Sequence, residues 1–112
     1  MIVDKKRVRI PVLLDTGAGA CIFRTVIAEH LGIDWRNAPD MNLGGLGGPC
    51  KGYGVDVKLV IPAATYAWDA RVLFSEGMDK SPYMGVLGYN GFFEHFEVNF
   101  KAKRFRVFLG SR

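Results

Sequence analysis

The stretch VLLDTGAGACIF, residues 12–23, decides how this chain folds. An apolar run carries one carboxylate, that of Asp15, to a turn of small residues, and a second apolar pair follows at once. A carboxylate at the end of a buried strand is unusual, because its burial costs several kcal/mol unless the group is paired or hydrogen-bonded. The stretch therefore predicts a special task for Asp15 and a partner for its side chain.

Length and composition predict one domain that spans residues 1–112. A chain of 112 residues is long enough for a single hydrophobic core, and a hydrophobic content of 49% excludes a disordered chain. The 14 glycines and 8 phenylalanines favour a β-rich protein with tight turns.

The charge pattern does not favour a nucleic-acid partner. The net charge is +4, and the cations are scattered apart from KAKRFR at residues 101–106. Apolar residues alternate with the charges there, which predicts a strand with a basic solvent face. No groove-reading motif accompanies this segment, so we expect no binding to nucleic acid. A basic β-barrel that binds nucleic acid through this segment is the alternative.

The sequence predicts neither a metal nor another cofactor. Cys21, Cys50, His30 and His95 lack the spacing of metal ligands, and the two thiols are expected to be reduced in a cytosolic compartment. Charges interrupt the N-terminus too early for a signal peptide, and the longest apolar stretch, 57–68, is too short to span a bilayer. We therefore expect a cytoplasmic location and no membrane contact from this segment, which could be one piece of a longer protein.

The pattern along the chain predicts mostly β-structure with two short helices. Alternating apolar residues predict strands, and apolar residues at helical spacing before Gly32 predict a short amphipathic helix. The expected segments are a hairpin at 1–14, a helix at 24–31, an irregular stretch at 33–43, a hairpin at 42–61 with GGLGG at its tip, a strand at 65–74, a polar loop at 75–83, a buried strand at 84–88, a helix or turn at 89–96 and a final hairpin at 96–108.

Three separated motifs carry a resemblance to a known family. They are LLDTGA at 13–18, GGLGG at 44–48 and VLG at 86–88, and they occur in the order found in that family. With these motifs the chain resembles the retropepsin-type aspartic proteases, the single-domain kin of the retroviral proteases, and more closely their bacterial members. The resemblance covers nearly the whole chain. It implies an all-β acid-protease half-barrel, that is, a closed β-barrel with a flap hairpin and one or two short helices.

The resemblance implies an aspartic endopeptidase that acts as a homodimer. Such an enzyme hydrolyses peptide bonds with a water held between a general base and a general acid, and two close carboxylates that share one proton supply both. This chain has a single Asp-Thr-Gly, and its other acids lack that context. The partner of Asp15 must then be Asp15 of a second copy, related by a two-fold axis.

Neighbouring residues acquire roles from the same resemblance. Thr16 is expected to hydrogen-bond across the dimer axis, and Gly17 to admit the backbone of a protein or peptide substrate. The flap would fold over that substrate, which binds as an added, extended strand. The residues expected to bind substrate are Ala18, Gly44, Gly45, Leu46, Gly47 and Gly48, and those expected to support the catalytic loop are Val86, Leu87 and Gly88.

The sequence also departs from the retroviral members and leaves plainer interpretations open. Gly19, Ala20 and Tyr89 stand where those members carry two acids and an Arg, so both ends of an ion pair are replaced together. The N-terminal strand is short, which would move the dimer interface to the C-terminal hairpin. Asp15 could instead cap its own turn, and GGLGG could be an ordinary loop. A non-catalytic binding or dimerisation module of the same fold is the alternative function.

Overall fold

The computed structural model describes most of the chain. The described residues are 2–3, 6–15, 17–44, 50–61, 66–94, 96–101 and 104–109. Within the strands at 2–3, 96–101 and 104–109, only the backbone is described. Five of the expected site residues lie outside the described residues, namely Thr16, Gly45, Leu46, Gly47 and Gly48.

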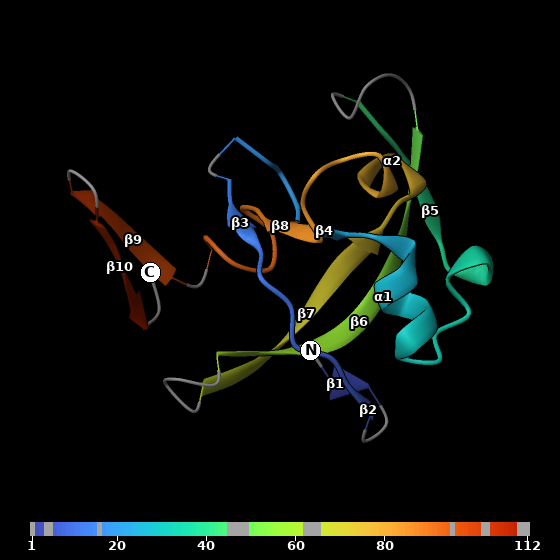
Figure 1. Cartoon of the computed structure of the whole chain (residues 1–112), viewed down its shortest axis with the longest axis horizontal. Helices are drawn as coiled ribbons and strands as arrows, with labels where there is room; N and C mark the ends of the chain where they lie inside the picture. Colours follow the sequence, from blue (N-terminus) through green and yellow to red (C-terminus); the bar gives the residue numbers. More distant parts are fainter. Residues whose placement is uncertain are drawn as a thin grey trace.

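The fold is mostly β and is built on one curled sheet of eight strands (Figure 1). Its strand order is β2-β1-β6-β7-β4-β8-β3, with β5 paired to β6. The strands β2 and β3 stand at the two ends of this order, and no pairing joins them in the described part of the chain. The sheet is therefore an open half-barrel, and the expected closure into a barrel is not found there. The bounds are β1 Ile2–Val3, β2 Lys6–Arg7, β3 Leu13–Leu14, β4 Ile22–Phe23, β5 Asp40–Leu43, β6 Cys50–Ile61, β7 Tyr66–Phe74 and β8 Gly85–Leu87.

The long antiparallel pair of β6 and β7 forms the middle of the sheet. Apolar residues on the inner side, such as Val57 and Val72, are buried, and charged residues between them face solvent. On the outer side Arg71 lies opposite Asp56, with 2.9 Å between Nε and Oδ1, and Lys58 lies opposite Asp69 in the same way. The alternation predicted both strands: β6 lies in the hairpin expected at 42–61, and β7 coincides with the strand expected at 65–74 to within one residue.

Two short α-helices cover the sheet. The first, α1 at Thr25–His30, confirms the predicted helix, and Gly32 ends it with a φ of +71°. The second, α2 at Glu76–Asp79, lies in the segment predicted to be a polar loop. The sequence prediction missed it because the helix has a single turn; its signal is Ser75, whose side chain accepts a hydrogen bond from the Gly77 amide.

Two further segments differ from the expectation. The stretch at 33–43, predicted to be irregular, contains a 3₁₀ turn at Trp35–Asn37 and the strand β5, which pairs with β6. The N-terminal hairpin of β1 and β2 is confirmed, but the residues from Val8 to Val12 are not in a strand. Pro11 lacks an amide donor for a sheet ladder, which accounts for the break before β3.

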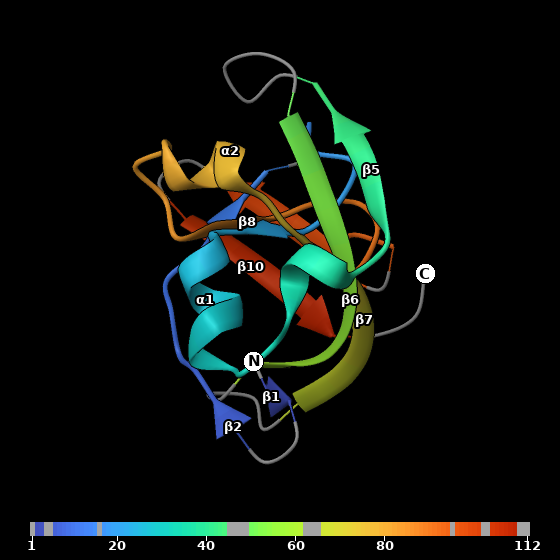
Figure 2. The ribbon, with the colours of Figure 1, turned by 90° about the vertical axis from the view of Figure 1, so that its right-hand side faces the viewer.

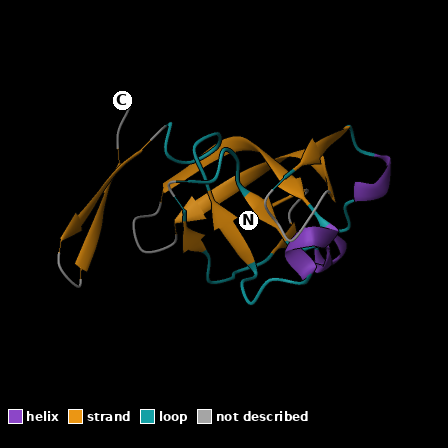
Figure 3. Cartoon of the chain, turned by 90° about the horizontal axis from the view of Figure 1, so that it is seen from above, coloured by secondary structure: helices purple, strands orange, loops and turns teal. Residues whose placement is uncertain are grey.

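The C-terminal hairpin is confirmed and stands apart from the curled sheet (Figures 1 and 3). It consists of β9 at Phe96–Lys101 and β10 at Arg104–Leu109, which form a two-stranded sheet of their own. The segment at 89–94 before it is a turn, one of the two expected forms. In the part of the chain that the structure describes, no helix has the length and apolar character needed to cross a membrane.

Candidate active site

The position of β8 between β3 and β4 creates the candidate site (Figure 1). Leu13 and Leu14 pair in parallel with Val86 and Leu87, while β4 pairs with β8 in the antiparallel sense. The loop at 15–21 joins the ends of β3 and β4, so it must cross the end of β8. This topology places Asp15 at the crossing.

Asp15 is held at both its backbone and its side chain. Its amide donates a hydrogen bond of 3.0 Å to the carbonyl of Leu87, which continues the ladder of β3 and β8 by one residue. Its Oδ1 accepts a hydrogen bond of 2.9 Å from the amide of Gly17, and its carbonyl accepts one of 3.1 Å from the amide of Ala18. Asp15 as a residue is half-buried, and no ion pair to its carboxylate is found among the described residues. The side chain thus caps its own turn and keeps one oxygen in a fixed orientation.

The loop is tied to the chain that follows β8. Tyr89 donates from its amide to the carbonyl of Ala18 at 2.9 Å, and Asn90 donates to that of Gly19 at 3.0 Å. Gly88 passes directly beneath the loop, where a Cβ atom would lie 2.6 Å from the carbonyl oxygen of Ala18. Real Cβ atoms do not come so close to backbone oxygen, so only glycine fits this position.

A small apolar cluster supports the loop from below. Its four buried residues come from β4, β7, α2 and β8, and three partly buried residues from the loop and from β5 pack against them. Room for Leu43 of β5 exists because Gly52 has no side chain: a Cβ atom there would lie 2.7 Å from a methyl group of Leu43. The buried members are Ile22, Leu73, Met78 and Val86, and the partly buried ones are Ala18, Ala20 and Leu43.

The structure thus brings most of the described site residues to one place. Asp15, Gly17 and Ala18 lie on the loop, and Val86, Leu87 and Gly88 lie against it. Gly44 lies at the end of β5, in the hairpin whose arms β5 and β6 run side by side (Figure 2). This pairing, from Asp40–Tyr53 to Leu43–Cys50, confirms the two arms of the predicted hairpin.

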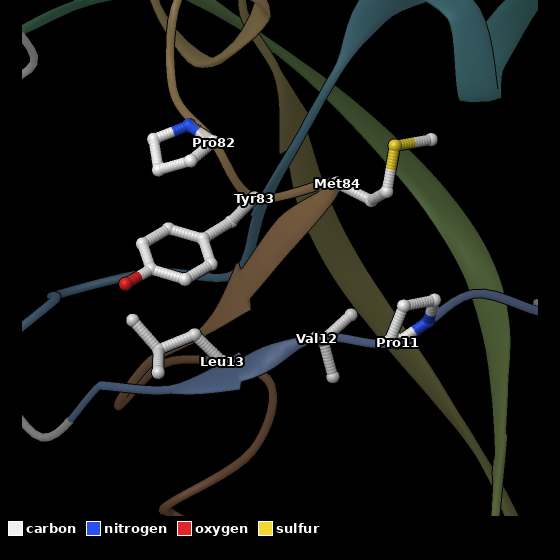
Figure 4. A pocket seen from close by; sticks show the side chains of 6 residues that line it. All are labelled: Pro11, Val12, Leu13, Pro82, Tyr83 and Met84. Carbon is white, nitrogen blue, oxygen red and sulfur yellow. The ribbon is translucent and has the colours of Figure 1, made fainter.

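An open groove that the sequence prediction missed lies beside the loop (Figure 4). It has a volume of about 190 Å³. The side chains of Leu13 and Tyr83, which are 38% and 46% exposed, point toward each other across it. Side chains two residues apart on an extended chain point to the same side, so Leu13 and Asp15 share one face. The lining residues are Pro11, Val12, Leu13, Pro82, Tyr83 and Met84. The one signal for this groove in the sequence was Leu13, an apolar residue two positions before Asp15.

The two cysteines differ in their surroundings: Cys21 is buried, and Cys50 is half-buried. Burial raises the pKa of the Cys21 thiol to about 11, and its Sγ contacts the carbonyl of Asn90 at 3.4 Å, so this group stays protonated at neutral pH. Both Cys21 and Cys50 are free thiols. Among the described residues, no group of three or more His, Cys, Asp or Glu side chains could hold a metal ion.

In comparisons with known proteins, the chain matches no family model, no curated protein and no solved structure. The function must therefore be inferred from the chain's own residues.

Proposed function

We propose that the chain is a retropepsin-like aspartic endopeptidase in which the Asp15 residues of two copies hydrolyse a peptide bond. The observation that carries the proposal is the carboxylate of Asp15, oriented by its hydrogen bond with the Gly17 amide on a small-residue loop that crosses the end of β8. A turn cap alone needs one carboxylate oxygen, the Oδ1 that binds the Gly17 amide. The second oxygen is the group that would take part in chemistry.

We infer a second copy because the chain has a single Asp-Thr-Gly and most of its other described carboxylates already have partners. Each of six described acids binds a cation, a hydroxyl or an amide of its own neighbourhood. These pairs are Asp34 with Asn37, Asp40 with Lys51, Asp56 with Arg71, Asp69 with Lys58, Asp79 with Thr25 and Glu94 with Gly91. A carboxylate pair is therefore best formed by two Asp15 residues across a two-fold axis.

Two such carboxylates would divide the work of hydrolysis. Close to one another they cannot both ionise, so they share one proton. The ionised member removes a proton from a water, and the shared proton polarises the scissile carbonyl and later passes to the leaving amine. No covalent intermediate and no cofactor is needed for this reaction.

The groove beside Leu13 suits an apolar side chain of the substrate. Its wall is made of apolar and aromatic side chains, and it lies on the same face of the chain as Asp15. A substrate strand that passes Asp15 would direct every second side chain toward this face. We therefore expect cleavage beside apolar residues in extended segments.

The test is peptide cleavage by the wild type and by Asp15→Asn. Asparagine keeps the oxygen that accepts from Gly17, so the variant should fold and dimerise but lose all cleavage, measured with a peptide library between pH 4 and 7 with and without pepstatin. Asp69→Asn, on the outer face of β7, is the matched control and should retain activity.

Two other results would each support a different function. A folded wild-type dimer without pepstatin-sensitive cleavage would favour the non-catalytic dimerisation module. Retention on heparin that falls with salt, and that is lost when Lys101, Lys103 and Arg104 are neutralised, would favour nucleic-acid binding.

A further inference from the structure

One arginine fixes the wall of the groove. Arg24, the residue before α1, donates from its Nε to the carbonyl of Tyr83 at 2.8 Å and from its Nη2 to the carbonyl of Ser81. Its backbone amide donates to the carbonyl of Met84 at 3.0 Å. Three carbonyl groups within four consecutive residues are thus bound by a single residue.

These contacts matter because the segment at 81–84 is not part of a helix or a strand. Carbonyl groups outside regular structure bind either water or a side-chain donor, and a side-chain donor also fixes their position. A guanidinium group presents several N–H donors in a rigid, planar fork, so it can reach two carbonyl groups at once. A lysine ammonium at the end of a flexible chain cannot reproduce that geometry.

Thr25, the residue after Arg24, anchors the chain just before the segment at 81–84. Thr25 is buried. Its amide and its hydroxyl donate hydrogen bonds of 2.9 Å and 2.7 Å to the carboxylate of Asp79. Arg24 and Thr25 therefore hold the segment from Asp79 to Met84 against the first turn of α1. Pro82 and Tyr83, which line the groove, lie between these anchors.

We propose that Arg24 is a positioning residue that sets the shape of the groove and with it the preference for the substrate side chain that enters. It acts through the backbone of Tyr83. The loop of Asp15 is held separately, by Leu87, Tyr89 and Asn90. This inference rests on the proposed function, in that the groove is taken to receive part of a peptide.

The consequence is a separation of specificity from catalysis. Without the guanidinium, the Tyr83 wall is no longer fixed opposite Leu13, so a large apolar side chain loses its fit whereas a small one loses little. The hydrogen bonds that hold Asp15 do not involve Arg24. KM for a peptide with a large apolar residue should therefore rise while kcat stays unchanged.

The experiment compares Arg24→Gln and Arg24→Lys with Arg71→Gln. Arg71 also donates two side-chain hydrogen bonds, but to the Asp56 carboxylate on the outer face of the sheet, which makes it the matched control. Hydrogen exchange of the amides at 81 and 83–85 reports on the wall and needs no catalysis; residue 82 is a proline and has no amide hydrogen. We expect about tenfold faster exchange in Arg24→Gln, an intermediate effect in Arg24→Lys and none in Arg71→Gln.

Specificity is measured in the Asp15→Asn background, so that it does not depend on turnover. The dissociation constants of two peptides that differ only by Leu against Ala are compared, and the preference for Leu should fall about tenfold with Arg24→Gln. KM and kcat for the same peptides are then measured with Asp15 present.

Unchanged exchange at 81–85 in both Arg24 variants would overturn the proposal, as would faster exchange with an unchanged Leu-to-Ala preference. Equal binding of the two peptides by the Asp15→Asn protein would overturn it as well. Absence of turnover in the wild type, with the Leu preference present and dependent on Arg24, would refute the protease and support the role of Arg24 in a peptide-binding module.

Discussion

Gly88 lies against the backbone of Ala20 so closely that a Cβ atom on it would stand 2.3 Å from the Ala20 carbonyl oxygen. The two residues come from opposite parts of the chain, and their contact lets the loop of Asp15 cross over the end of β8. The obstacle is backbone on both sides, since the carbonyl of Ala18 is also near. A rigid neighbour of this kind cannot move aside as a flexible side chain could.

Gly88→Ala should therefore destabilise the fold by about 3 kcal/mol or more, because overpacking against backbone forces the loop away from β8. Urea unfolding followed by circular dichroism measures the change. Gly19→Ala is the control in the same loop: a Cβ atom there meets nothing within 4 Å, and stability should change little. Equal losses in both variants would show that the close approach at Gly88 is not what limits substitution.

Asp15 should carry a structural role that is separable from its chemistry. Asp15→Ala removes the acceptor of the Gly17 amide and should cost about 1 kcal/mol of stability relative to Asp15→Asn, which keeps that acceptor. Both variants should be inactive in peptide cleavage. Thermal unfolding and a cleavage assay on the same preparations separate the two effects. An active Asp15→Asn protein would contradict the proposed mechanism.

Mixing experiments test whether the active unit contains two copies of Asp15. When wild type and Asp15→Asn are mixed in equal amounts and allowed to exchange subunits, about a quarter of the dimers hold two Asp15 residues. The cleavage rate per total subunit should then fall to about a quarter of the wild-type value, whereas independent monomers would give about half. Sedimentation at the assay concentration checks that dimers are present. A rate of one half in a dimer whose subunits are shown to exchange, for example by mixing two labelled preparations, would exclude the shared site.

The buried thiol of Cys21 should make stability depend on alkaline pH. Its pKa is raised from 9.0 to about 11 by burial, so between these values the unfolded chain loses the thiol proton while the folded chain keeps it. The folded state then binds more protons, and stability should fall as the pH rises from 9 to 11. Urea midpoints across this range should show a smaller decrease for Cys21→Ala than for the wild type. Cys50→Ala, at the half-buried thiol, provides the comparison.

Local patterns predicted the elements that local interactions determine. Gly32 marked the end of α1, and the alternation of apolar and charged residues marked β6 and β7. A one-turn helix such as α2 is stabilised by its cap and its packing rather than by its own periodicity, and it was missed. The expected closed barrel required two sheet edges to meet, and no local pattern encodes that pairing.

The sequence pointed to candidate residues for the site, but it did not indicate their arrangement. The motif around Asp15 identified the carboxylate, whereas the crossing of its loop over β8 depends on contacts such as Asn90 with Gly19, far apart in the sequence. The groove was missed for the same reason. Its two walls come from the segments at 11–13 and 82–84, and neither is recognisable as a wall without the other.

The apolar cluster beneath the loop has a mechanical consequence. Leu43, which pairs with Cys50 at the turn end of the β5–β6 ladder, and Ala18 and Ala20, on the loop of Asp15, pack against the same buried cluster. Closely packed interiors transmit a displacement instead of absorbing it. A change in the packing of Leu43 should therefore shift the cluster that supports the loop of Asp15. The hairpin and the loop thus share one support, and a change in the size of the Leu43 side chain should alter the position of Asp15 through that cluster.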